Sequence, residues 1–213
     1  MMRGFRRGLM LLATGSILAT AAAAQDRANV PRGAIVQPLA RDDGSELRGY
    51  LTTLADNAPS VDALVGAGRA AMRMGDVEAA LTFFGRADGL SPRDARVKAG
   101  MASGLLQMGQ PQAALSLFAE AIALGAPEAE IAGDRGLAFD LVGDPQRAQR
   151  DYLLALRGRN DPEVRRRMAL SLAISGSRDA ALRLIDDQLR ANDRAGWRTQ
   201  AFVLALTGDA AGA

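Results

Sequence analysis

A helical motif recurs along this chain with a spacing of 32 to 34 residues between its glycines. It first occurs in residues 75–92, GDVEAALTFFGRADGLSP, and returns from Gly109, Gly143 and, more loosely, Gly176, while Gly208 begins a further copy. Each full copy places an alanine four residues before a large side chain: Ala80 and Phe84, Ala114 and Phe118, Ala148 and Tyr152, Ala181 and Ile185. Residues four apart share one face of a helix. The chain is therefore predicted to fold as stacked helical repeats.

The segments between these motifs also have a helical period, so each repeat is expected to be a pair of helices. Gly75 and Asp76 predict the turn between the first two, over about 60–74 and 77–88, with Asp76 as the N-cap. Five of the eight prolines fall where helices should begin, and Ser91 and Pro92 are expected to be the cap and first residue of one of them. With 48% hydrophobic but only 4% aromatic residues, many small-residue helix contacts are favoured over one large aromatic core.

Residues 60–208 resemble tetratricopeptide-repeat (TPR) proteins. The resemblance is carried by the alanine–aromatic spacing, the turn glycines, and Leu64, Gly68 and Ala71 at the upstream motif positions. It implies an all-α, right-handed superhelical solenoid of antiparallel helix pairs. The expected repeats are about 60–92, 93–126, 127–160 and 161–192, with a half repeat at 193–213. A helix over 45–56, capped by Ser45, is expected to cover the first repeat, because solenoid ends need capping.

The N-terminus has the features of a secretory signal peptide. Arg3, Arg6 and Arg7 precede a short apolar run and then Ala22-Ala23-Ala24, which predicts cleavage between Ala24 and Gln25. Residues 25–43 then read as an extended linker. Residues 1–24 hold three of the 26 basic residues and none of the 24 acidic ones, so the mature net charge is −1. We therefore expect an exported, periplasmic protein with no transmembrane segment after cleavage and no nucleic-acid partner.

No set of catalytic or metal-binding residues is recognisable in the sequence. It contains no cysteine and no histidine, which excludes thiol chemistry and removes the commonest metal ligand and general base. The adjacent acids Asp186-Asp187 and Asp42-Asp43 lack the further ligands of a cation site. The sequence thus predicts neither enzymatic activity nor a metal or other cofactor.

The resemblance implies that a partner peptide binds on the concave side, which the first helix of each repeat lines. Carried onto this chain, the groove candidates are Arg69, Met72, Arg73, Ser103, Leu106, Gln107, Leu137, Asp140, Leu141, Arg166, Leu170 and Ile174. The arginines would suit an acid near one end of the peptide. Each apolar candidate could instead be buried against a neighbouring helix, and Arg69 and Arg73 could pair with Asp62 or other nearby acids. The chaperone-type carboxylate clamp is not supported, because Val65 and Arg69 occupy its first two positions.

These observations favour a non-catalytic scaffold that binds a protein or peptide partner in the cell envelope. Exported bacterial relatives of this kind include tight-adherence pilus assembly proteins, which are usually lipidated, and proteins that join such repeats to a peptidoglycan-binding SPOR domain. In the half repeat, Phe202, Val203 and Leu206 are expected to form an open apolar face. We interpret it as the end of a fragment of a longer protein or as a cap. Self-association through this last helix, or a non-catalytic part of an enzyme, are the alternatives.

Overall fold

The computed structural model describes residues 43–56, 59–208 and 212. Within these residues it contains ten helices and no strands, as the sequence predicted for an all-α chain. They are α2 (Asp43–Asp56), α3 (Val61–Met74), α4 (Val77–Leu90), α5 (Ala95–Gln107), α6 (Pro111–Ala123), α7 (Glu128–Leu141), α8 (Pro145–Leu156), α9 (Pro162–Ile174), α10 (Arg178–Arg190) and α11 (Arg194–Leu206). The predicted signal peptide and residues 25–42 of the predicted linker lie outside the described residues.

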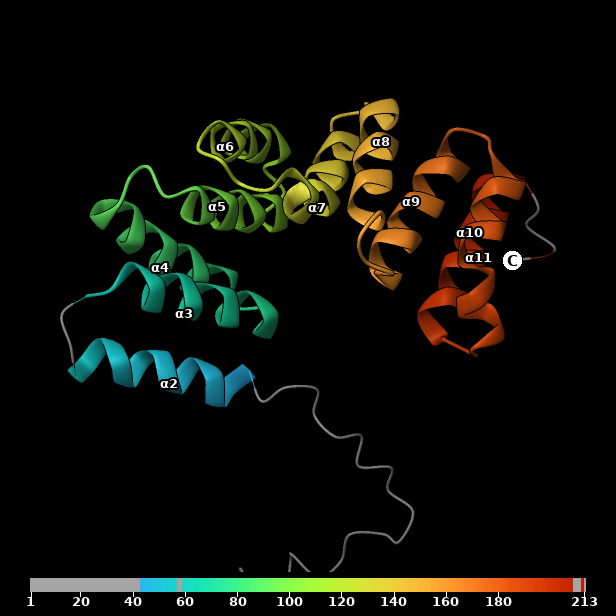
Figure 1. Ribbon diagram of the computed structural model, residues 1–213. Coiled ribbons are helices and arrows are strands. Elements are labelled where there is room, and N and C mark those ends of the chain that lie inside the picture. Colours follow the sequence, from blue (N-terminus) through green and yellow to red (C-terminus); the bar gives the residue numbers. More distant parts are fainter. Residues whose placement is uncertain (1–42, 57–58, 209–211, 213) are drawn as a thin grey trace, which may run out of the picture. The chain divides into compact units, whose positions relative to one another are not determined.

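Helices α3 to α10 form consecutive antiparallel pairs (Figure 1). We call the first helix of each pair an A helix (α3, α5, α7, α9, and also α11) and the second a B helix (α4, α6, α8, α10). The recurring alanine and large side chain of each B helix are buried. Phe84, Phe118, Tyr152 and Ile185 each have 0% of their surface exposed. The repeated motif is thus the core of each pair, as the sequence predicted.

The glycines that set the repeat length end the A helices. Gly75, Gly109, Gly143, Gly176 and Gly208 have φ angles of 82°, 73°, 83°, 81° and 88°. This is the left-handed region, which glycine adopts without the steric cost that a Cβ adds. Asp76 then caps α4, because its side chain accepts a hydrogen bond from the Ala79 amide. The turn predicted at Gly75 and Asp76 is confirmed.

One of the expected helix starts is wrong, and the helix expected to begin near Pro127 starts one residue later. Ser91 and Pro92 do not open a helix; α5 begins at Ala95, and Asp94 caps it by accepting a hydrogen bond from the Arg96 amide. The reason is a β-turn over 91–94, closed by the Asp94 amide donating to the Ser91 carbonyl at 3.1 Å, and proline suits its second position. Pro127 is the N-cap of α7 rather than its first residue.

Helix α2 packs on α3 at the N-terminal end of the repeats. It begins at Asp43, two residues before the expected Ser45, so Ser45 lies inside the helix. The Tyr50 ring occupies the space beside Gly66, where a Cβ would come within 2.3 Å of it. Asp43 and Glu46, in the first turn of α2, accept hydrogen bonds from Arg73 at 2.7 and 2.5 Å. The contact therefore combines close packing with ion pairs.

Helix α11 is only partly open. Val203, which the sequence placed on the open face, is 0% exposed and packs in one cluster with Ala173, Ala181 and Ile185. Phe202 and Leu206 are 61% and 53% exposed. The expected face is thus wrong for Val203, because that side chain turns inward onto the α9–α10 pair.

Polar contacts link each A helix to the next, and we call this series the polar ladder. Arg96 of α5 bonds Asp62 of α3 at 2.7 Å. The Ser103 hydroxyl of α5 donates to Asp134 of α7 at 2.7 Å, and Arg167 of α9 donates to the same carboxylate at 3.0 Å. Arg166 of α9 reaches Asp193, the N-cap of α11, at 3.1 Å. The ladder thus places at least one polar contact between each A helix and the next.

Candidate functional site

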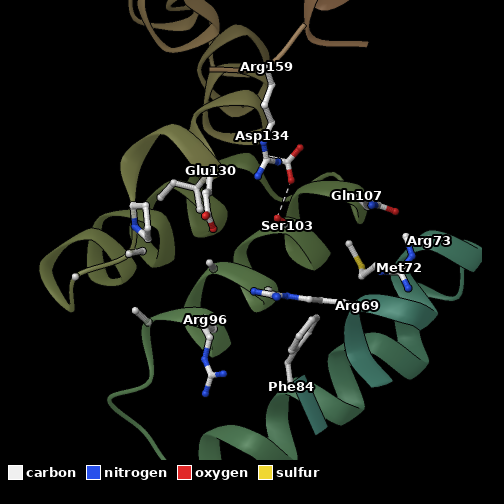
Figure 2. Close-up of a pocket in the computed structure, with 17 residues that line it drawn as sticks. Arg69, Met72, Arg73, Phe84, Arg96, Ser103, Gln107, Glu130, Asp134 and Arg159 are labelled. Carbon is white, nitrogen blue, oxygen red and sulfur yellow. Dashed lines mark hydrogen bonds between the residues drawn. The ribbon is translucent and has the colours of Figure 1, made fainter. Parts of the chain in front are cut away.

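A groove of about 580 Å³ lies between the A helices α3, α5 and α7. Figure 2 shows its residues. Five of the twelve groove candidates line it: Arg69, Met72, Arg73, Ser103 and Gln107. The sequence did not predict its other residues as part of a groove: Phe84, Ala95, Arg96, Ala99, Gly100, Gly125, Ala126, Pro127, Glu130, Ile131, Asp134 and Arg159. The predicted concave face and this groove therefore overlap at α3 and α5.

Small residues form the floor of the groove. Ala99 and Gly100 lie there on α5, and a Cβ on Gly100 would come within 2.5 Å of the Phe84 ring. Phe84 is fully buried, so the glycine lets this ring pack directly beneath the floor. Ile131 adds an almost buried apolar side chain from α7. Ala99 and Gly100 themselves add few side-chain atoms to this floor.

The four arginines of the groove differ in whether their charge is neutralised. Arg73 is held by Asp43 and Glu46, and Arg96 by Asp62 and Asp94. The hydrogen bond that Arg73 donates to Asp43 raises the pKa of Arg73, and those that Arg96 donates to Asp94 raise the pKa of Arg96.

The guanidinium groups of Arg69 and Arg159 have no hydrogen-bond or ion-pair partner among the described residues. Figure 2 shows Arg69 extending across the middle of the groove, while Arg96 points away from it.

The α7 side of the groove carries two acids. Asp134 is engaged in the polar ladder by Ser103 and Arg167. The carboxylate of Glu130 has no partner within the described part of the chain, and it lies on the same side as Arg159 (Figure 2). A smaller pocket of about 170 Å³ adjoins this side and shares Glu130, Asp134 and Arg159 with the groove. Charges of both signs therefore meet at this end.

The other seven candidates do not line the groove. Leu106 is buried in the core cluster of Phe118, and the half-buried Leu137 packs against the same cluster. Leu170 packs against the core beside Ile185. The alternative of burial is correct for Leu106, while Leu137 and Leu170 are half-buried against the core.

Asp140 and Arg166 are taken up by internal contacts. Asp140 accepts hydrogen bonds from Tyr152 at 2.9 Å and Ser171 at 2.7 Å, and burial raises the pKa of its carboxyl group. Arg166 pairs with Glu163 and Asp193. Its neighbours Arg165 and Arg167 pair with acids as well. All three arginines of the run 165–167 are therefore engaged in ion pairs within the chain, and two of them belong to the polar ladder.

The last two candidates, Leu141 and Ile174, end their A helices and are 55% and 68% exposed. Met74, Met108 and Leu206 occupy similar positions at the ends of α3, α5 and α11, and all are about half exposed. The last turn of each A helix therefore presents one exposed apolar side chain beyond the groove.

One sequence signal could have found more of the groove. Arg96, Ala99 and Gly100 precede Ser103 by seven, four and three residues, so they share its helix face. In α5 the prediction used only Ser103, Leu106 and Gln107, from the last turns of the helix, and missed the turns before them. Arg159 follows α8 outside any helix, where no periodicity could have pointed to it.

The described residues contain no group of three or more acidic side chains placed to hold a metal ion. None of their helices is both long and apolar enough to cross a membrane.

Comparison with solved structures identifies the fold. A thermophilic TPR protein from Thermus thermophilus is 20% identical, with a TM-score of 0.63 over 88% of this chain and 96% of that chain. A tetratricopeptide repeat protein from Parabacteroides merdae is 18% identical, with a TM-score of 0.57 over 78% of this chain and 66% of that one.

YrrB, described as a TPR protein with an unusual peptide-binding site, is 15% identical, with a TM-score of 0.52 over 76% of this chain and 94% of that chain. No family model and no curated protein matches the sequence. The structural similarities confirm the predicted all-α superhelical repeat fold.

Proposed function

We propose that this chain, which has the TPR fold, is a non-catalytic scaffold that holds a segment of another protein in the groove between α3, α5 and α7. The observation that carries the proposal is the groove itself, about 580 Å³ with a floor of Ala99 and Gly100. A floor of small residues lets a bound main chain come close, and the half-buried Met72 and the buried Ile131 supply apolar contacts at its walls. Grooves that hold peptides combine such contacts with a few polar groups. The peptide-binding site named for YrrB supports the same use of the fold.

The absence of native cysteine makes the groove easy to test. Gln107 lines the groove and is exposed, whereas Gln112 is equally exposed on α6 and does not line it. Each is changed to cysteine and coupled to a bulky maleimide. A phage library of random dodecapeptides is then selected on the unlabelled protein. We expect the label at position 107 to block the selected peptides and the label at position 112 to leave them bound.

Two outcomes would contradict this function. The library could yield no peptide that binds the purified protein, or both labels could have the same effect on the peptides it yields. Circular dichroism of the labelled proteins shows whether the fold is intact, so a loss of binding is not mistaken for unfolding.

Export to the periplasm stays a prediction from residues 1–25, and we include it in the proposal. The protein recovered from cells should begin at Gln25, which N-terminal sequencing measures directly. A soluble cytoplasmic form that retains Met1 would refute export. The predicted cell-envelope partner and self-association through the last helix also stay predictions.

A further inference from the structure

The groove has a net positive lining, but most of that charge is already engaged. Four arginines and two acids line it. Arg73 and Arg96 each contact two carboxylates at 2.5 to 2.7 Å. Ion pairs of this kind leave little charge for a further ligand, because the carboxylates neutralise the guanidinium groups. The charge available to a partner therefore comes from the remaining side chains.

At the α7 end the remaining charges oppose one another. Glu130 and Arg159 both lack a partner among the described residues, and they carry opposite signs on the same side of the groove (Figure 2). Asp134 is neutralised there by Arg167. This end thus has no strong preference for the sign of a partner's charge.

At the α3 end one positive charge is left. Arg69 is exposed, has no partner within the described residues, and extends across the groove. Arg73, one helical turn further along α3, is held by the acids of α2 instead of joining Arg69. The sequence predicted that both arginines would be available to a ligand. Because the acids of α2 hold Arg73, only Arg69 remains available. Met72 lies between them along the helix and offers an apolar contact beside it.

We infer that the groove selects a protein segment with an acidic side chain placed against Arg69 and an apolar side chain next to it against Met72 and the floor. This inference rests on the proposed function, since it names the segment that the groove would hold. A guanidinium donates paired hydrogen bonds to a carboxylate in a fixed plane. Because Arg69 has no acid of its own, the partner's carboxylate meets no competitor for it. Charge complementarity of this kind contributes mainly specificity and association rate.

The experiment compares two arginines of the same groove. Arg69→Gln and Arg96→Gln each remove one positive charge, but only Arg69 lacks a partner of its own. One peptide selected on the wild-type protein is labelled with fluorescein and measured by fluorescence anisotropy. A second copy carries Asn for every Asp and Gln for every Glu. We expect the wild-type protein to bind the acidic copy about tenfold more tightly, as a hydrogen-bonded charge pair implies.

The variants then locate the preference. In Arg69→Gln the two copies should bind alike, and in Arg96→Gln the acidic copy should keep its advantage. The affinity of the acidic copy should also fall with added salt in the wild type and less so in Arg69→Gln. Equal binding of both copies to the wild type would overturn the inference, as would a preference lost only in Arg96→Gln. Both results leave the proposed function standing, whereas failure to select any peptide would overturn that function itself.

Discussion

Phe118→Ala is expected to destabilise the fold by about 3–5 kcal/mol. Phe118 is 0% exposed and belongs to the core cluster that joins Ala102 and Leu106 of α5, Ala114 of α6, and Ile131 of α7. Truncation would leave a cavity at the junction of two successive repeats. Urea denaturation followed by far-UV circular dichroism measures the change in the free energy of unfolding.

Ile174→Ala is the matched control for this prediction. Ile174 is a large apolar residue of the same fold, but it is 68% exposed. We expect its substitution to change the free energy of unfolding by no more than about 0.5 kcal/mol. If both variants unfolded at the urea concentration of the wild type, the assignment of the repeat core would be wrong.

Arg135→Met is expected to cost about 3–5 kcal/mol, because it leaves a buried carboxylate without its counter-ion. Arg135 of α7 donates two hydrogen bonds, of 2.6 and 2.7 Å, to Asp151 of α8. Asp151 is only 7% exposed. The hydrogen bond that Arg135 donates to Asp151 also raises the pKa of Arg135. Urea denaturation again provides the measurement.

The double variant Arg135→Met with Asp151→Leu separates loss of the pair from loss of packing. Replacing both partners by apolar residues removes the unpaired charge, so most of the lost stability should return. Arg190→Met is the surface control: Arg190 and Asp186 form an ion pair with side chains 74% and 46% exposed, for which about 0–1 kcal/mol is expected. A double variant less stable than Arg135→Met would show that the aspartate itself packs the interface.

The repeat core could be predicted because its residues recur at a regular spacing in the sequence. Ala80 and Phe84, with their equivalents, are set by the helical period, and Gly75 is set by its left-handed turn. Other features depend on geometry beyond one repeat. The buried pair of Arg135 and Asp151 exists only because α7 and α8 approach at that depth, and neither residue stands out from its neighbours. The start of α5 was ambiguous, because a serine followed by a proline suits both the start of a helix and a β-turn. The structure has the β-turn.

The groove was harder to predict than the core. Arg69 and Ser103 were found because the resemblance places one side of each A helix on the concave face. Which turns of the A helices border a groove depends on how the helices tilt against each other. Asp140 looked like a groove acid, yet Tyr152 and Ser171 hold it inside. Whether Arg73 is available depends on α2, which is far from the groove in sequence. The tilt of the helices, the Ser171 contact to Asp140 and the position of α2 each involve an element outside the repeat that carries the candidate residue.

The polar ladder joins the junctions between consecutive repeats. Among the described helices, an A helix contacts the A helices on either side of it and the neighbouring B helices, so a small rotation at one junction adds to those at the others. Asp134 joins two junctions, because it accepts from Ser103 on the groove side and from Arg167 on the other. A displacement of Asp134 would therefore change the contacts of α7 with both α5 and α9.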